Sequence, residues 1–439
     1  LYYDNELRRQ GITLVDTPGA NSVNARHTNV AFDYIKDADA IIYVTYYNHA
    51  VTSADRDFLI QLGRVKESFE LDKMFFIVNA SDLAKDDAEL KLVVDYVEDQ
   101  LLQYGIRHAQ IYPLSSKKSL QEKVNNETLN EQMETFESTF YHFIEHDLHA
   151  LTYEAAIWDI NRVKTRLENI IQSAKLDESE REKQIIRLQE KQSEGLKLLE
   201  NKIADNLVER AKERIERQLH FVKERMFIRF HDMFQEHFNP TTVTENGRQA
   251  LQQLESNRNR LIDYVGYELL QEVRAVSLRL EAFINQLLKD FYEEVSRELL
   301  TIDETITLAN YEDKRFTTPN YEQAFTQIDL DIFQRALKIF KNLRSYFEQN
   351  DREKMKDTFY EILEPEIEVY LNEQKLNMEE AYLEQLNQLF TQLLRDTTEE
   401  VNMIIKQQIN VLNTEIDITK YSEKLDQIKL ILDNLDSVV

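Results

Sequence analysis

Glycine and proline are scarce in this chain, and their placement divides it into two parts. Seven glycines and five prolines occur in 439 residues, and four of the glycines lie before residue 106. Both residue types interrupt helices, glycine through its backbone entropy and proline through its missing N–H. A sequence that lacks them over long stretches forms long helices. The pattern therefore predicts a mixed α/β head at the N-terminus, followed by a long α-helical body.

The charge balance and the missing cysteine exclude several classes of function. The chain has 53 basic and 80 acidic residues, a net charge of −27. Because nucleic-acid binding needs clustered positive charge, we expect no nucleic-acid partner. Without cysteine there is no disulfide, thiolate nucleophile or cysteine zinc site. No run approaches the roughly 18 apolar residues of a transmembrane helix, so we expect any membrane contact to be peripheral.

Four short apolar runs in the head indicate buried strands, because they are rich in Ile, Val, Phe and Tyr and each ends at a turn signal. They are Ile12–Val15, Ala40–Tyr46, Met74–Val78 and Gln110–Leu114. Helical stretches lie between them, for example Asp55–Glu67 and Asp87–Tyr104. Strands that alternate with helices predict a parallel sheet with covered faces. In such sheets ligands bind at the carboxyl ends of the strands.

Polar motifs come directly after three of these four runs. They are Asp16-Thr17-Pro18-Gly19, Asn79-Ala80-Ser81-Asp82 and Ser115-Ser116-Lys117. Each motif alone is typical of a turn or a helix cap. Because all three stand at strand ends of one predicted sheet, we expect them to converge on a single edge, where a ligand can bind.

The order of these motifs resembles that of the P-loop GTPases: a strand ending in D-T-P-G, then one ending in N-x-x-D, then one ending in S-S-K. The surrounding sequence LVDTPGANSVNARHT and the helical body make the chain similar to the bacterial dynamin-like proteins, specifically the two-headed kind found in bacilli. The resemblance covers essentially the whole chain. It implies an α/β P-loop GTPase-type head, partial because its N-terminal part is missing, and a long all-α helical-bundle neck and stalk.

The resemblance implies a site for GTP and Mg²⁺, in which the first motif meets the metal and the phosphates. Asp16 would hold Mg²⁺ through water, as a carboxylate after such a strand does. The backbone N–H at Gly19 would meet the γ-phosphate, because glycine lets the backbone approach closely. Thr17 and Pro18 complete this loop.

The other two motifs would bind the base. Asp82 would accept hydrogen bonds from the guanine N1–H and 2-amino groups, and adenine has no such donor pair. Asn79 would brace the base loop. Ser115 and Ser116 would close over the base, with Lys117 beside them.

Two departures from the family pattern weaken this site. The position after Asn79 often carries a lysine that stacks on the base, and here it is Ala80. No G-x-x-x-x-G-K-[ST] motif occurs anywhere. We therefore expect the phosphate cradle to lie upstream of Leu1, and the chain as given to hydrolyse GTP poorly. Arg26 and His27 come after the first motif, but a lone His in a polar loop is more often a surface residue, so no catalytic residue is assigned.

Two long apolar seams characterise the body. Apolar residues recur from Leu196 to Phe238 and from Leu251 to Leu299, on average every 3.7–3.8 residues, roughly the straight-helix period. Each seam spans roughly 60–70 Å and predicts a stalk-like bundle. The turn Asn239–Thr242 allows either an antiparallel hairpin or a hinge. Only the last helix, from Tyr421 to Val439, has a heptad pattern.

A basic amphipathic segment interrupts this acidic chain. From Leu330 to Arg344 there are four basic residues and one acid. On a helical wheel Ile332–Phe347 separates apolar from basic residues, which is typical of a helix at a membrane interface or of a bundle helix with a basic solvent face. The resemblance places a membrane-touching tip here. The predicted lipid-binding residues are Phe316, Tyr321, Phe325, Phe333, Arg335, Lys338, Phe340, Lys341 and Arg344.

A second aromatic patch, Phe221–Phe238, has rings around much of its helix, and we expect it to be buried. The expected divisions are the C-terminal part of a GTPase domain (1–122), neck helices (123–195), stalk helices (196–300), the tip (301–350) and returning stalk and neck helices (351–439).

Together the motifs and the resemblance favour a dynamin-like GTPase that binds and remodels, tethers or fuses membranes, with hydrolysis driving head–stalk movement. The expected partners are an anionic phospholipid membrane and further copies of the chain, through heads and possibly stalks. The expected location is cytoplasmic, peripheral to the inner face of the cell membrane. The alternative is a non-enzymatic helical adaptor with a vestigial nucleotide-binding head. An ATP-driven rod protein of the chromosome-organising kind is disfavoured by Asp82.

Overall fold

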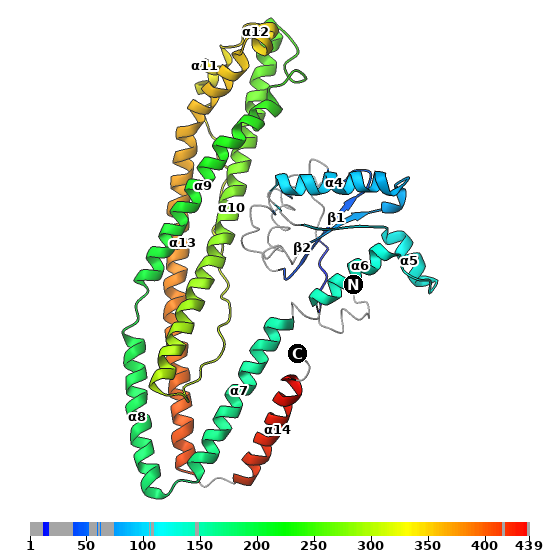
Figure 1. Ribbon diagram of the computed structural model, residues 1–439. Helices are drawn as coiled ribbons and strands as arrows, with labels where there is room; N and C mark the ends of the chain where they lie inside the picture. The colour runs from blue at the N-terminus through cyan, green and yellow to red at the C-terminus, as the bar shows by residue number, and fades with distance from the viewer. Residues whose placement is uncertain are drawn as a thin grey trace. The chain divides into compact units, whose positions relative to one another are not determined.

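The computed structural model describes two compact units, which we call the head (Leu1–Ala150) and the body (Leu151–Val439). Figure 1 shows their elements. The described residues are 12–16, 38–51, 59, 62, 74–104, 106, 109–144, 149–414 and 418–436.

The described residues of the head form a parallel three-stranded sheet. Its strands are β1 (Ile41–Tyr46), β2 (Met74–Asn79) and β3 (Gln110–Leu114), in the order β1-β2-β3. Both pairs of neighbours are parallel, and α4 (Asp87–Gln103) connects β2 to β3. The prediction of a parallel α/β sheet is confirmed, with three strands at the predicted positions.

The fourth predicted strand, Ile12–Val15, is wrong. Residues 12–16 have no regular secondary structure and pair with none of the strands that the structure describes. Leu14 is 64% exposed and Val15 52%, whereas Ile12 packs against the core. An apolar run becomes a strand only where an edge is available for its backbone hydrogen bonds, and a run of four residues alone does not specify that edge.

Two apolar clusters cover the two faces of β2. On one face Phe76 and Val78 pack against Val97 and Leu101 of α4. On the other face Phe75 and Ile77 pack against α6 (Glu131–His142), and the ring centroids of Phe75 and Phe140 lie 5.3 Å apart, edge to face. Burial on both faces explains why β2 is a continuous apolar run.

Long helices dominate the body, as the scarcity of glycine and proline predicts. They are α7 (His149–Ala174), α8 (Glu178–Glu200), α9 (Asp205–His237), α10 (Gly247–Ile302), α13 (Asp351–Leu412) and α14 (Ile418–Asp436). The 56 residues of α10 and the 62 of α13 correspond to about 84 Å and 93 Å of helix. In Figure 1 α9, α10 and α13 run side by side along most of their length.

Helices α9 and α10 form an antiparallel hairpin, one of the two arrangements that the sequence left open. Arg225 pairs with Glu272 at 2.7 Å. Arg229, four residues later on α9, pairs with Glu268, four residues earlier on α10, so the two helices run in opposite directions. The apolar seams of both helices are buried between them and α13. The first seam is divided, because Ile203 lies between α8 and α9 and is 68% exposed.

An extended segment, residues 303–329, returns along α10 without forming a helix; we call it the strap. The side chain of Asn285 accepts a hydrogen bond from the N–H of Lys314 at 2.7 Å and donates one to its carbonyl at 2.8 Å. Gln385 of α13 binds both backbone groups of Thr317 in the same way, at 2.8 and 3.0 Å. An extended chain packed against a core needs such partners, because its backbone N–H and C=O groups form no hydrogen bonds within a helix or a sheet.

Substitution of Gly266 by Ala should destabilise the body. Gly266 lies on α10 beneath the strap, and a Cβ there would stand 2.2 Å from the carbonyl oxygen of Ala324. The strap would have to shift, at a cost of about 1–3 kcal/mol, which urea denaturation measures.

Gly195→Ala is the matched control for this prediction. Its Cβ would meet only side chains, the nearest being Leu299 at 3.3 Å, and a side chain can adjust. Alanine also favours the helix by about 1 kcal/mol. If both variants changed the free energy of unfolding equally, the tight contact at Gly266 would be refuted.

Candidate functional site

The carboxyl ends of β2 and β3 lie next to each other and carry two of the predicted motifs. Asn79, the last residue of β2, stands opposite Leu114 of β3. The chain then turns at Ala80, whose φ of 64° is left-handed, and continues into η3 (Ser81–Leu83). After β3, Ser115 begins α5 (Ser116–Val124). The parallel sheet thus brings these two polar motifs to one edge, and convergence of the first motif with them stays a prediction.

Asn79 ties these loops together. Its Oδ1 accepts hydrogen bonds from the N–H of Ala80 at 2.8 Å and from the N–H of Ser116 at 3.0 Å. Its backbone carbonyl accepts from the N–H of Tyr47, just beyond β1, at 2.9 Å. One side chain and its own backbone therefore fix the ends of all three strands relative to one another.

The remaining residues of the two motifs differ in accessibility. Ser115 is buried, and its Oγ accepts from the N–H of Lys118 at 3.3 Å as the N-cap of α5. Ser116 and Lys117 are exposed in the first turn of α5, and Asp82 is exposed in η3. The Asp82 carboxylate is therefore accessible to a ligand above this edge of the sheet, whereas the Ser115 hydroxyl acts as a helix cap.

The predicted phosphate side of the site is less defined. Asp16 is exposed at the end of residues 12–16. Thr17, Pro18, Gly19, Arg26 and His27 lie outside the described residues. Within the described part of the chain, no group of three or more His, Asp or Glu side chains is arranged to ligate a metal. A single exposed carboxylate suits a cation held through water.

The predicted amphipathic helix Ile332–Phe347 is broken into short pieces. The structure has η5 (Leu330–Phe333), α11 (Gln334–Leu337) and α12 (Leu343–Glu348). Asn342 caps α12 by accepting from the N–H of Ser345 at 2.9 Å. Short helices let apolar side chains pack downward onto the end of the bundle from several directions, which a single straight helix would prevent.

The aromatic residues predicted to touch lipid mostly do not face solvent. Phe316, Tyr321 and Phe333 are buried in the body core, and Phe333 stacks on Phe359 with ring centroids 5.3 Å apart. Phe325 and Phe340 are half-buried and pack against the same core. Their assignment as lipid-facing rings is corrected, because folding already uses their apolar surface.

The basic residues of the same segment remain accessible. They are Arg335, Lys338, Lys341 and Arg344. Arg344 pairs with Glu348 at 3.0 Å on the surface. This end of the body, residues 330–350, to which we restrict the name tip from here on, therefore offers positive charge rather than an apolar face.

The aromatic segment Phe221–Phe238 is only partly buried, whereas the sequence predicted burial throughout. Phe230, Phe234 and Phe238 are buried as predicted, but Phe221 is 47% exposed and Phe227 is 58% exposed. Ile228 beside them is exposed as well. The spacing indicates this exposure, because Phe221 and Ile228 are seven residues apart and share a helix face that is not the buried face of α9.

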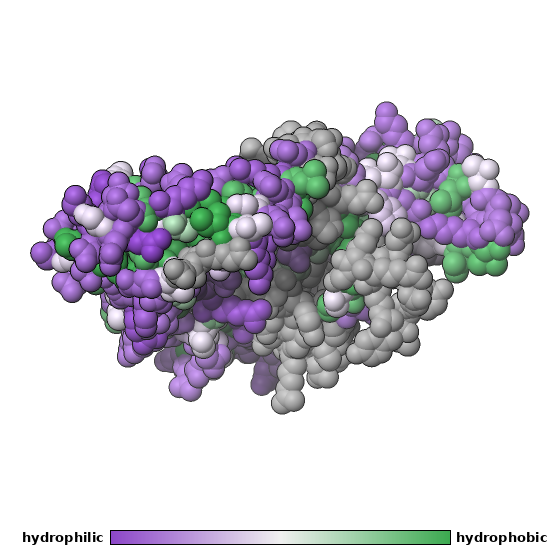
Figure 2. Space-filling view, turned by 90° about the horizontal axis from the view of Figure 1, so that it is seen from below, coloured by the Kyte–Doolittle hydropathy of each residue, from purple (hydrophilic) through white to green (hydrophobic). Residues whose placement is uncertain are grey.

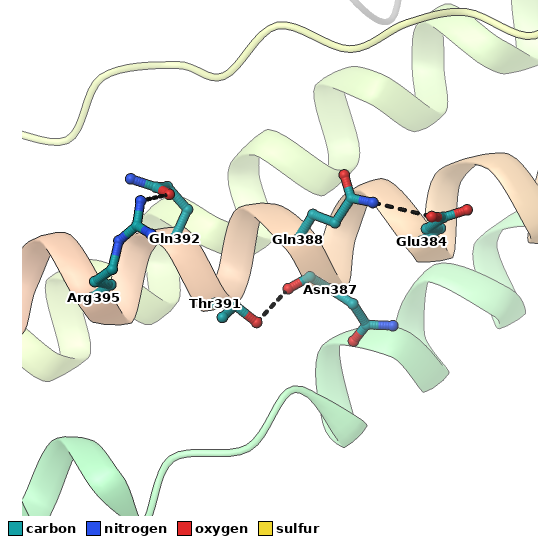
Figure 3. Close-up of a pocket in the computed structure, with 6 residues that line it drawn as sticks. All are labelled: Glu384, Asn387, Gln388, Thr391, Gln392 and Arg395. Carbon is teal, nitrogen blue, oxygen red and sulfur yellow. Dashed lines mark hydrogen bonds between the residues drawn. The ribbon is translucent and has the colours of Figure 1, made fainter.

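A polar hollow on α13 is not a candidate site. Figure 3 shows its lining, which comes from one face of one helix: Glu384, Asn387, Gln388, Thr391, Gln392 and Arg395. These residues bond mostly to one another, as Gln388 does to Glu384 at 3.0 Å. The hollow therefore does not bring together groups from different elements.

The described helices include none that is long and apolar enough to cross a bilayer. The face in Figure 2 is mainly hydrophilic, with scattered apolar residues between polar ones.

Comparison with known proteins gives consistent matches. Residues 1–81 match the model of the Dynamin family. The chain is 32% identical to Dynamin-like protein A of Bacillus subtilis (strain 168) over 364 residues, 82% of this chain and 30% of that protein. It therefore spans less than a third of that relative.

Two further matches are more distant. "Probable transmembrane GTPase FZO-like, chloroplastic" of Arabidopsis thaliana is 26% identical over 119 residues, 27% of this chain and 12% of that protein. A solved structure of an oligomerised bacterial dynamin pair, described as a mechanism for long-range sensing and tethering of membranes, is 17% identical. The match covers 96% of this chain and 59% of that chain, with a TM-score of 0.31.

Substitution of Asn79 by Ala should loosen the loop at the start of α5. The N–H of Ser116 loses its acceptor, and its amide hydrogen should exchange about fivefold faster or more, the factor for a hydrogen bond of about 1 kcal/mol. Asn79→Asp, which keeps the accepting oxygen, is the control. Equal exchange at Ser116 in both variants would show that Asn79 does not hold this loop.

Proposed function

From the premise that the chain is a relative of the bacterial dynamin-like proteins, we propose that its head binds GTP with Mg²⁺ and hydrolyses it. The body then transmits the resulting movement to a membrane. The observation that carries the proposal is the bond between Asn79 and the N–H of Ser116. It joins the loop of Asp82 to the first turn of α5 and leaves the Asp82 carboxylate open above them.

The chemistry of this edge suits guanine. An ionised carboxylate accepts two hydrogen bonds side by side, and guanine presents two adjacent donors, N1–H and the 2-amino group. Adenine presents an acceptor at N1, so it does not satisfy Asp82. Ser116 and Lys117 stand on the neighbouring loop, where they flank the base.

Asp16 and the Thr17-Pro18-Gly19 loop serve the metal and the phosphates in this proposal. Bound Mg²⁺ neutralises phosphate charge, and Asp16 holds it through water. The remaining phosphate contacts require a glycine-rich cradle that these residues do not contain. Hydrolysis is therefore a property of the intact protein in this proposal.

The tip contacts the membrane through charge. Arg335, Lys338, Lys341 and Arg344 are exposed, and cations near an anionic surface each contribute about 1 kcal/mol to binding. With helices of about 84–93 Å, the body is long enough to act as a lever. We further propose that copies associate through their heads and that the protein tethers, fuses or remodels membranes at their cytoplasmic face.

The alternative function is a helical adaptor whose head no longer binds nucleotide. Ala80, in place of a base-stacking lysine, favours it. Nucleotide binding by the intact protein distinguishes the two functions.

Substitution of Asp82 by Asn should change the base preference of the intact protein from guanine to xanthine. The Asn amide group opposes the guanine 2-amino donor but matches the 2-oxo acceptor of xanthine. We expect GTP affinity to fall about 10- to 100-fold, as for loss of a hydrogen bond to a charged group, and xanthosine triphosphate affinity to rise. Calorimetry with both nucleotides measures this.

Asp87→Asn makes the same chemical change at an exposed position in α4 and should leave both affinities unchanged. If Asp82→Asn binds GTP like the unaltered protein, Asp82 does not read the base. If even the unaltered intact protein does not bind GTP, the adaptor function is the correct one.

Charge reversal at the tip should weaken membrane binding. Lys338→Glu with Lys341→Glu removes two accessible cations, and we expect about 30-fold weaker binding, or more, to vesicles of phosphatidylcholine with phosphatidylglycerol. Flotation measures the bound fraction. Lys183→Glu with Lys197→Glu changes the net charge equally on α8, at exposed positions, and should bind normally. Equal binding by both double variants would eliminate the tip as the membrane contact.

A further inference from the structure

The strap begins where α7, α10 and α13 meet, at the end of the body opposite the tip, which we call the base. The carbonyl of Leu308 accepts a hydrogen bond from the indole N–H of Trp158 on α7 at 3.3 Å. The N–H of Ala309 donates to Glu400 of α13 at 3.0 Å. Arg162 of α7 binds the same carboxylate oxygen at 3.1 Å. The start of the strap is therefore part of the contact that holds α7 on the body.

The middle of the strap runs along α10 as an extended chain. The hydroxyl of Tyr292 donates to the carbonyl of Ala309 at 2.9 Å, and Ala324 lies against Gly266. From Tyr292 to Gly266 α10 covers about 39 Å. The 15 residues of strap between the same points reach about 50 Å when fully extended. The strap is thus extended to about four-fifths of its full reach, and it joins the contact at Ala309 to the contact at Ala324 without a helix in between.

The far end of the strap leads directly into the tip. Arg258 of α10 is buried and donates to the carbonyl of Leu330 at 3.2 Å, the first residue of η5. Phe333 and Ala336 come next within the core. The position of the exposed cations Arg335 and Lys338 thus depends on where the strap ends.

The contact of α7 with the body is incompletely satisfied. The Nε and Nη2 atoms of Arg166, one turn beyond Arg162, are buried without a hydrogen-bond partner among the described residues. Burial and the neighbouring Arg162 lower the pKa of Arg166. A partly satisfied buried polar cluster is a weak point, so this contact is a place where α7 can come away from the body.

We propose that the strap is a mechanical coupling between α7 and the tip: release of α7 from Leu308 and Glu400 loosens the strap and, through Leu330, the packing of the tip helices. Helix α7 begins at His149, where the head ends, so any movement of the head that pulls α7 reaches the tip by this route. The coupling does not require that the head hydrolyse a nucleotide.

A thiol reporter tests the coupling, because the chain contains no cysteine. Ala336→Cys places one thiol in the tip and Ala211→Cys places one on α9, both at fully buried positions. Each is combined with Trp158→Phe, which removes the N–H donor but keeps a ring, and with Arg162→Gln. The rate of labelling by a soluble disulfide reagent reports how often each site opens.

We expect Trp158→Phe to accelerate labelling at position 336 about fivefold, the factor for one hydrogen bond of about 1 kcal/mol, and to leave position 211 unchanged. Arg162→Gln should act in the same direction. Unchanged labelling at position 336 in both variants would overturn the coupling. Equal acceleration at both positions would also overturn it, since that result reports general unfolding. Val163→Ala, a change at an exposed position on α7, should affect neither thiol.

Discussion

Irregular backbone that packs against a core must find hydrogen-bond partners outside any helix or sheet. In this molecule side-chain carboxamides supply many of them. Asn79 accepts from two loop N–H groups at the end of β2, and Asn285 and Gln385 each bind both backbone groups of one strap residue. A carboxamide suits this role because it carries a donor and an acceptor side by side, as a peptide group does. The proposed base site and the strap therefore both depend on hydrogen bonds from a side-chain carboxamide to the backbone.

Buried charge gives the long hairpin its register. Glu268 and Glu272 are almost completely buried, and each pairs with an arginine of α9. Such pairs add little net stability, because desolvation offsets their attraction, but a buried carboxylate without its partner is costly. The apolar seams alone would tolerate a slip of one helical turn, since their periods are nearly regular. The arginines oppose that slip, so the distance between the base and the tip of the body is fixed.

Periodicity and composition were enough to predict the regular elements of the fold. Three strands, the parallel sheet and the long helices were visible in the sequence, and the resemblance to bacterial dynamin-like proteins is confirmed by the 32% identity to Dynamin-like protein A. The strap and the tip were not predictable in the same way. A helical wheel assumes a continuous helix, so it shows neither the capping role of Asn342 nor the partners of Phe316 and Tyr321. From the sequence, aromatic residues in a polar stretch indicate an exposed segment. In the structure Asn285 and Gln385 bind the backbone of that stretch and hold it against the core.

Burial of the tip's rings changes what membrane binding at this end requires. If the rings entered the bilayer, affinity would depend on apolar area and persist at high salt. With Phe333 and Tyr321 buried in the core, the proposed membrane binding would depend on the exposed cations and would weaken as salt rises. The chain's net charge of −27 does not oppose this strongly, because at physiological salt charges interact over about 8 Å. A bundle of about 90 Å keeps most of its acids beyond that distance, so the local charge of the tip decides whether an anionic surface is attracted.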